Sequence, residues 1–188
     1  MDGVSAYILA GGKSTRMGSD KGLLPLNESF FAALIVTALK KASIEKITVV
    51  SANKAYDVLN CNRIEDIYPD KGPVGGVYTA LSHSKTVHNI ILSVDVPLVS
   101  AEIINWLIAN IALNKQLTQV KVLNKPNPLI AVYHKGAASV FKEHLLKNQL
   151  KLRTVVDEIP HQTIEVPEAW AALLQNINTK EDYKSLLA

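Results

Sequence analysis

Apolar residues in this sequence gather in short runs that alternate with longer amphipathic segments. Short runs bounded by glycine or polar residues predict buried strands, and they lie at 4–10, 46–50, 89–94 and 129–133; residues 62–64 are a candidate for a further strand. Segments with helical spacing lie at 30–42, 75–83, 100–114 and 136–147. Ser100 is a suitable cap for the third helix, and Thr-x-x-Asp from Thr179 predicts the start of a last one.

This alternation of strands and helices predicts an α/β protein. Such a pattern is typical of one mostly parallel, Rossmann-like sheet with helices on both faces and right-handed crossovers. The length of 188 residues suits a single domain, so we expect one domain over residues 1–188. Ligands of such folds bind at the carboxyl edge of the sheet, which is where chemistry is expected.

Composition and charge exclude several classes of protein. A hydrophobic fraction of 48% and a charged fraction of 20% are those of an ordinary globular protein. A net charge of +3, without a block of like charge, is too small to indicate nucleic-acid binding, although it suits anionic small molecules. Cys61 is the only cysteine, which excludes an intrachain disulfide, and neither a signal peptide nor a membrane span is expected. We therefore expect a soluble, cytoplasmic protein.

A glycine-rich loop directly follows the first predicted strand, in Leu9-Ala-Gly-Gly-Lys-Ser-Thr-Arg-Met-Gly-Ser-Asp-Lys-Gly22. Glycines let backbone amides converge on phosphate oxygens, and three basic residues add cationic donors: Lys13, Arg16 and Lys21. A polyphosphate is the expected ligand. The alternative is a flexible surface loop, which the basic residues and the position after a buried strand make the weaker interpretation.

Two familiar phosphate loops do not fit this segment. A Walker loop needs a glycine five residues before Gly12, but Tyr7 stands there. The dinucleotide fingerprint Gly-x-Gly-x-x-Gly fails at Gly11-Gly12-Lys13. The loop therefore belongs to another class of phosphate-binding sequence.

The segment Leu-Ala-Gly-Gly-x-Ser-x-Arg-Met-Gly-x-Asp-Lys-Gly resembles the signature of the molybdenum cofactor guanylyltransferases, within the sugar-nucleotidyltransferase superfamily. Its first half is shared across that superfamily, whereas the Asp20-Lys21-Gly22 ending is narrower. Further segments follow in the family's order over nearly the whole chain: Ser51-Ala-Asn53, Ile64-Glu-Asp66, Gly72-Pro-Val-Gly-Gly76, Asp95-Val-Pro97 and Asn176-Ile-Asn-Thr179. The resemblance implies a nucleotide-binding half at about 1–100 and an acceptor-binding half at about 101–188.

Asp95 is the predicted metal ligand. It follows the most apolar strand and precedes Pro97, so its carboxylate is expected to point from the sheet edge toward the glycine loop. One or two carboxylates with substrate phosphates can hold Mg²⁺, and the family's metal ligand stands at this place. The structural alternative is a solvated aspartate that caps the next helix.

The resemblance also implies the nucleotide contacts. The backbone amides from Leu9 to Gly12 would cradle the triphosphate, with Arg16 and Lys21 as cationic clamps. Asp66 resembles the acid that contacts the nucleotide, although Asp70 competes for that role. Ser51 stands where the family often has asparagine, and Asn53 follows two residues later. The set of predicted nucleotide-binding residues is Leu9, Ala10, Gly11, Gly12, Lys21, Ser51, Asn53, Asp66 and Asp95.

The remaining polar residues carry weaker predictions. The histidines show no ligand spacing with Cys61, so structural or surface roles are expected rather than a zinc site. Lys151 and Arg153 are candidates for the acceptor phosphate, because the family places acceptor contacts in its C-terminal half. Asn176 and Asn178, from the last matching segment, are predicted in the same role. A solvated helix face is the alternative for the two basic residues.

The activity implied by the resemblance is transfer of GMP from GTP to molybdopterin with release of pyrophosphate, with Mg²⁺ as cofactor. The residues predicted to act in catalysis are Arg16, Lys21 and Asp95. Alternatives are cytidylyl transfer to molybdopterin, activation of a sugar phosphate, or a nucleotide sensor without turnover. We expect a monomer that makes transient contacts with cofactor-insertion proteins or acceptor molybdoenzymes.

Overall fold

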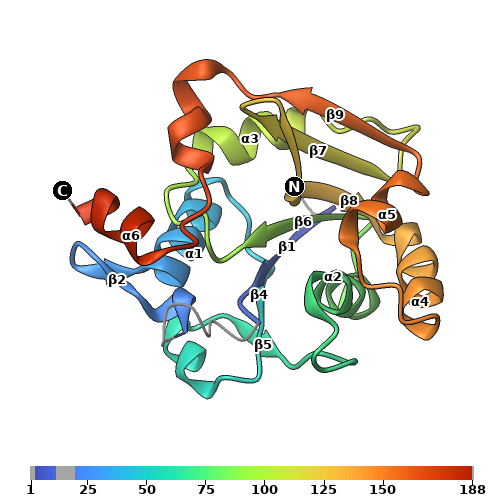
Figure 1. Ribbon diagram of the computed structural model, residues 1–188, viewed down its shortest axis with the longest axis horizontal. Coiled ribbons are helices and arrows are strands. Elements are labelled where there is room, and N and C mark those ends of the chain that lie inside the picture. Colours follow the sequence, from blue (N-terminus) through green and yellow to red (C-terminus); the bar gives the residue numbers. More distant parts are fainter. Residues whose placement is uncertain (1–2, 12–19, 188) are drawn as a thin grey trace.

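A computed structural model describes residues 3–11 and 20–187 of the chain. Its centre is a seven-stranded sheet with the order β5-β4-β1-β6-β8-β7-β9, shown in Figure 1. The strands are β1 (Val4–Leu9), β4 (Ile47–Val50), β5 (Asn62–Ile64), β6 (His88–Ser93), β7 (Leu117–Val122), β8 (Lys125–His134) and β9 (His161–Glu165). The short strands β2 (Pro25–Leu26) and β3 (Ser29–Phe30) form a separate antiparallel pair.

The helices connect these strands along the chain. The α-helices are α1 (Phe31–Lys41), α2 (Gly72–His83), α3 (Ala101–Ala109), α4 (Ala138–Leu146), α5 (Leu152–Asp157) and α6 (Lys180–Leu187). The 3₁₀ helices are η1 (Lys21–Leu23), η2 (Lys54–Leu59), η3 (Lys135–Ala137) and η4 (Glu168–Leu174). Within the described ranges, no helix is long and apolar enough to cross a membrane.

The sheet is mostly parallel, which confirms the predicted fold class. Neighbours β5, β4, β1 and β6 all run in parallel, and so do β7 and β9. Strand β8 is antiparallel to both of its neighbours. The chain passes from β1 to β4 on one side and later reaches β6 on the other side, so the strand order reverses beside β1. Such a switch point opens a crevice at the carboxyl ends of the strands.

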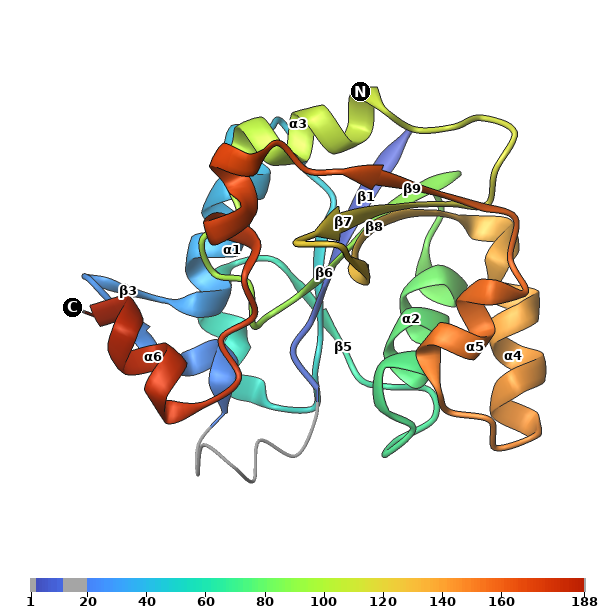
Figure 2. The same cartoon turned by 45° about the horizontal axis from the view of Figure 1, so that its top comes forward.

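Helices cover both faces of the sheet because the central strands are apolar on both sides. Alternate residues of a strand point to opposite faces. In β1, Ala6 and Ile8 pack into the core with α1 and α3, whereas Tyr7 and Leu9 pack into the core with α2, α4 and α5. Figure 2 shows these two groups of helices on either side of the sheet.

The structure corrects several predicted element boundaries. The third helix ends at Ala109 and not near Asn114, because Asn110 leaves the helical conformation with φ −99° and ψ 12°, and its Nδ2 caps the helix by donating to the Trp106 carbonyl at 2.8 Å. The strand expected at 129–133 is part of the longer β8, which forms a hairpin with β7. The sequence analysis also missed the strand β9 and the pair β2 and β3.

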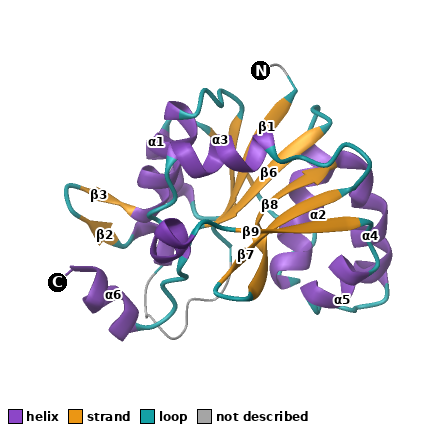
Figure 3. Cartoon of the chain, turned by 90° about the horizontal axis from the view of Figure 1, so that it is seen from above, coloured by secondary structure: helices purple, strands orange, loops and turns teal. Residues whose placement is uncertain are grey.

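The C-terminal segment returns to the first half of the chain. After η4 it passes the carboxyl end of β6, where the Ile177 N–H donates to the Asp95 carbonyl at 2.8 Å. Helix α6 then lies beside β2 and β3, as Figure 3 shows. Tyr183 fixes it there, since its hydroxyl donates to the Pro25 carbonyl at 2.6 Å and its ring meets Phe31 edge to face. Residues 175–178 are thereby brought to the carboxyl edge of the sheet.

Candidate active site

A cavity of about 540 Å³ opens at the carboxyl ends of β1, β4, β5 and β6. Parallel neighbours end at the same edge, so the loops that follow these strands converge there. The residues that line the cavity are Leu9, Ala10, Gly11, Asp20, Val50, Ser51, Ala52, Asn53, Glu65, Asp66, Pro69, Asp70, Gly72, Pro73, Gly76, Ser93, Asp95 and Leu129. Most of the predicted nucleotide contacts that the structure describes are in this set.

Gly11 lies close to the Asp66 side chain, just beyond the carboxyl end of β1. A Cβ atom at Gly11 would lie 3.2 Å from Asp66 Oδ2, so glycine allows the loop backbone to approach this carboxylate closely. Asp66 Oδ1 accepts a long hydrogen bond from Thr79 Oγ1 at 3.4 Å, and burial raises the Asp66 pKa. Asp70 also lines the cavity, so both candidate acids lie at the site, but Asp66 is the one beside Gly11.

One part of the predicted amide cradle is already occupied. The Ala10 N–H donates to the Val50 carbonyl at 3.1 Å and so extends the pairing of β1 with β4. This amide cannot also serve a phosphate in the same geometry. Leu9 and Ala10 line the cavity, and a phosphate contact from the Ala10 amide stays a prediction that requires this bond to open. Gly12 and Arg16 lie outside the described residues.

Asp95 lies just beyond β6, as predicted, and is one of the residues that line the cavity. Its Oδ2 accepts from Asn176 Nδ2 at 3.2 Å, whereas its Oδ1 is buried without a hydrogen-bond partner among residues 3–11 and 20–187. Burial raises the Asp95 pKa, and neighbouring Ser93 and Lys21 act against that rise. A buried carboxylate oxygen without a donor is the kind of ligand that Mg²⁺ prefers.

The number of protein ligands near Asp95 also bears on whether it can hold a divalent cation. No group of three or more His, Cys, Asp or Glu side chains that could hold a metal occurs in the described part of the chain. A cation at Asp95 would therefore take its remaining ligands from substrate phosphates and water, as Mg²⁺ usually does at nucleotide sites. The donor set present is compatible with Mg²⁺ on that condition.

Lys21 lies at the start of η1 and reaches toward the same place. Its Nζ donates to Asn178 Oδ1 at 2.7 Å, and its charge acts on Asp95. The segment 176–178 thus contacts the two predicted catalytic side chains that the structure describes, Asn176 at Asp95 and Asn178 at Lys21. The sequence predicted these asparagines as acceptor contacts, and the structure places them against Asp95 and Lys21.

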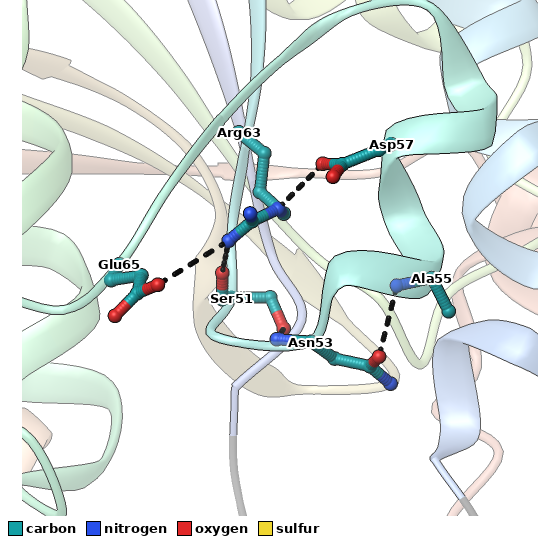
Figure 4. Close-up of polar contacts among 6 residues, drawn as sticks. All are labelled: Ser51, Asn53, Ala55, Asp57, Arg63 and Glu65. Carbon is teal, nitrogen blue, oxygen red and sulfur yellow. Dashed lines mark hydrogen bonds and ion pairs between the residues drawn. The ribbon is translucent and has the colours of Figure 1, made fainter.

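Ser51 and Asn53 stand in the loop after β4, where Figure 4 shows their polar contacts. Ser51 Oγ accepts from the Asn53 N–H at 3.1 Å, and Asn53 Oδ1 accepts from the Ala55 N–H at 3.0 Å. Each side chain therefore shapes the loop as well as lining the cavity. The side-chain oxygen of each residue already accepts a hydrogen bond from the backbone, so a nucleotide contact from either stays a prediction.

Arg63 is a site-supporting residue that the sequence analysis missed. Its guanidinium donates to the Ser51 carbonyl at 3.0 Å and to Asp57 Oδ1 at 2.7 Å, and it lies 3.7 Å from Glu65 Oε1 (Figure 4). These contacts raise the Arg63 pKa, chiefly through the hydrogen bond to Asp57. Arg63 fixes the cavity wall formed by the loop after β4. Sequence spacing gave no signal for it, because its partners come together only when β4 pairs with β5.

Lys151 and Arg153 are not brought to the cavity. They lie at the start of α5, and neither lines the cavity described above. The histidines are used in other contacts: His83 Nδ1 is 3.1 Å from the Tyr7 hydroxyl, and His144 Nε2 is 3.0 Å from Glu158 Oε2.

The same fold occurs in several solved structures. Similar solved structures include a protein of Aquifex aeolicus, 25% identical, with a TM-score of 0.79 over 94% of each chain. Another is the molybdopterin-guanine dinucleotide biosynthesis protein A of Archaeoglobus fulgidus, 21% identical, with a TM-score of 0.79 over 97% of this chain and 96% of that one.

The sequence comparisons give the family. Residues 6–164 match the MobA-like NTP transferase domain, and the chain belongs to this family. A probable molybdenum cofactor guanylyltransferase of Flavobacterium johnsoniae is 37% identical over 186 residues, which cover 99% of this chain and 97% of the relative. The family resemblance inferred from the glycine-rich loop and the later motifs is confirmed.

Proposed function

We propose that this chain transfers GMP from GTP to the terminal phosphate of molybdopterin and releases pyrophosphate. The observation that carries the proposal is the meeting of Lys21, Asp95 and a glycine-lined cavity at one edge of the parallel sheet. A cation and a buried carboxylate side by side suit a triphosphate with its metal. Membership in the MobA-like family and the names of the relatives support the choice of guanine and molybdopterin.

The proposed reaction is a phosphoryl displacement that needs no strong base. An oxygen of the acceptor phosphate, already an anion, forms a bond to the α-phosphorus of GTP. The bond from the α-phosphorus to the bridging oxygen breaks, and pyrophosphate leaves with that electron pair. Catalysis then depends on alignment and on neutralising charge.

The residues of the chain would divide this work. Lys21 would contact the phosphates from the side of η1, and Asn178 holds its ammonium in that direction. Asp95 would hold Mg²⁺ through the buried Oδ1, while Oδ2 stays with Asn176. When bound, Mg²⁺ would neutralise negative charge on the phosphate oxygens. Arg16 would act as a second cationic clamp, as the family resemblance implies. We place the reaction in the cytoplasm, with the protein acting as a monomer.

Isotopic labelling tests whether the α-phosphate is transferred. Purified protein with molybdopterin and Mg²⁺ receives GTP labelled at either the α- or the γ-phosphate. We expect the α-label in the pterin product and the γ-label in pyrophosphate. Release of the label as GMP or inorganic phosphate, without a pterin product, would contradict nucleotidyl transfer. No consumption of GTP at all, with binding retained, would favour a nucleotide sensor.

A further inference from the structure

The carboxylate of Asp20, a residue of the cavity lining, accepts hydrogen bonds from neighbouring protein donors at both of its oxygens. Asp20 Oδ1 accepts from the Tyr56 hydroxyl and from the Gly22 N–H at 3.1 Å. Asp20 Oδ2 accepts from Asn53 Nδ2 at 2.9 Å. Charge-assisted hydrogen bonds of this kind are among the strong polar contacts of a protein. Asp20 therefore joins the end of the glycine-rich loop to η2.

The donors that hold Asp20 are themselves fixed. Tyr56 is completely buried, and burial together with Asp20 raises its pKa, so that its phenol remains a donor. The Asn53 amide cannot turn over freely, because its Oδ1 accepts from the Ala55 N–H at the start of η2. Its Nδ2 is thereby directed to Asp20. Both side-chain donors to Asp20 are therefore held in place by their own surroundings.

Gly22 allows η1 to pack closely against Tyr56 and Val94. A Cβ atom at Gly22 would be 2.7 Å from Val94 Cγ2 and 2.9 Å from Tyr56 Cζ, both closer than a side chain tolerates. The backbone at this position therefore packs directly on Tyr56. Residues on both sides of Lys21 are anchored, Asp20 by its carboxylate and Gly22 by close packing.

We propose that Asp20 is a positioning residue that, clamped by Tyr56 and Asn53, fixes the backbone of residues 20–22 so that the Lys21 ammonium meets a phosphate group beside Asp95. Lys21 Nζ lies on Asn178 Oδ1 at 2.7 Å, so a shift of η1 would move the ammonium away from both Asn178 and Asp95. Misplacement by about 1 Å can cost roughly 100-fold in rate. The inference rests on the proposed function for the identity of the reaction.

An exchange of the two side chains tests this role. In Asp20→Asn, the introduced amide nitrogen faces Asn53 Nδ2, so two donors meet. In Asn53→Asp, two carboxylates meet. In the double variant D20N/N53D, the introduced amide donates to the introduced carboxylate, whose other oxygen still accepts from the Ala55 N–H. The double variant keeps the net charge of the original protein, and the carbonyl of its introduced amide remains an acceptor for Tyr56 and Gly22.

The expected pattern is loss in each single variant and recovery in the double variant. Each single change should lower kcat/KM for GTP by about 10- to 100-fold. The double variant should return to within about threefold of the original. Tyr56→Phe removes one donor while keeping the ring, so it should cause a smaller loss in the same direction. If the double variant stays as impaired as Asp20→Asn, the Asp20 charge acts on the ligand itself and the proposal is overturned.

A second background separates positioning from general stability. If Asp20 acts through Lys21, then Asp20→Asn should cause no further loss of activity in a Lys21→Met protein. An additional loss of about tenfold or more in that background would overturn the proposal. Melting temperatures of all variants are measured alongside, to show how far each change acts on the fold.

The affinity for pyrophosphate, measured by calorimetry, separates this inference from the proposed function. If the original protein transfers no nucleotide but pyrophosphate affinity follows the loss and recovery, the function fails and the positioning role stands. If transfer occurs but neither activity nor affinity follows that pattern, the positioning role fails alone. An original protein that neither transfers nucleotide nor binds pyrophosphate would contradict both.

Discussion

The two halves of the sheet differ in what stands at their edges. Strands β5, β4, β1 and β6 run in parallel, so their following loops meet at one edge and bring Ser51, Asp66 and Asp95 together. In the other half, β8 is antiparallel to its neighbours, and successive loops fall at opposite edges. Leu129 is the only residue of that half among the described residues that line the cavity.

The second half reaches the site by a different route. Its contribution does not come from the loop after a strand but from residues 175–178, which cross the carboxyl edge of the sheet. There Asn176 contacts Asp95 and Asn178 contacts Lys21. The comparison teaches that parallel pairing gathers the nucleotide side, while the second half supports it through one returning segment. Substitutions in the two halves should therefore differ strongly in effect.

The largest effect is expected for Asp95→Asn. This change keeps the shape but removes the charge that would hold Mg²⁺, so turnover should fall by about 100- to 1000-fold. Pyrophosphate release at saturating GTP measures it. Asp157→Asn in α5 is the matched control from the other half and should keep the original rate. Original turnover in Asp95→Asn with Mg²⁺ present would contradict the metal role.

The next effect in size is expected for Lys21→Ala. Loss of a charge-assisted contact to phosphate should weaken GTP binding by about 1.5 to 3 kcal/mol. Calorimetry measures the affinity. Lys142→Ala on α4, an exposed lysine of the other half, is the control and should bind GTP as the original does. Equal affinities for the two variants would remove Lys21 from the phosphate site.

A smaller effect sharpens the contrast within the second half. Asn176→Ala removes the donor to Asp95 Oδ2, and a net loss of about 1 kcal/mol corresponds to roughly fivefold in kcat. Arg153→Ala in α5, which does not line the cavity, should leave kcat unchanged. Steady-state kinetics with each substrate varied separates the two. A larger fall in kcat for Arg153→Ala than for Asn176→Ala would contradict the division proposed.

The smallest effect is on stability and follows from the raised pKa of Asp95. Because the folded-state pKa lies above the unfolded value, ionisation of Asp95 costs stability, and this cost grows as pH rises through that interval. Asp95→Asn removes the cost. The melting temperature of Asp95→Asn relative to the original should therefore be higher at about pH 7 than at about pH 3, without added metal. A difference that is the same at both pH values would contradict a buried carboxylate with a raised pKa.

The parallel half could be predicted well from the sequence because its signals are local. Strands β1, β4 and β6 there are short, mostly apolar runs, and the glycine-rich loop and Asp95 directly follow two of them. Strand direction at an α/β sheet then places their side chains at one edge. Ser51, Asp66 and Asp95, which the sequence places after predicted strands, accordingly line the cavity.

The second half was less predictable because its structure depends on distant or unusual contacts. The hairpin of β7 and β8 turns at Leu123 and Asn124, both with positive φ of 48° and 63°. A two-residue hairpin turn is usually recognised in a sequence by the dipeptide Asn-Gly or Asp-Gly, and neither occurs here. The contacts of Asn178 with Lys21 and of Asp20 with Tyr56 likewise arise only from the folded arrangement, so sequence spacing could not reveal them.

The choice of base tests the central claim most directly. Guanine offers an N1 hydrogen and an exocyclic amine to acceptors in a site, and cytosine lacks that pair of donors, so acceptors left unpaired would disfavour CTP. Purified protein, molybdopterin and Mg²⁺ receive equal GTP and CTP, and both dinucleotide products are quantified. We predict a guanine product in at least about tenfold excess, with equimolar pyrophosphate. A predominance of the cytosine product would contradict guanylyl transfer, and the absence of both products would contradict nucleotidyl transfer to this acceptor.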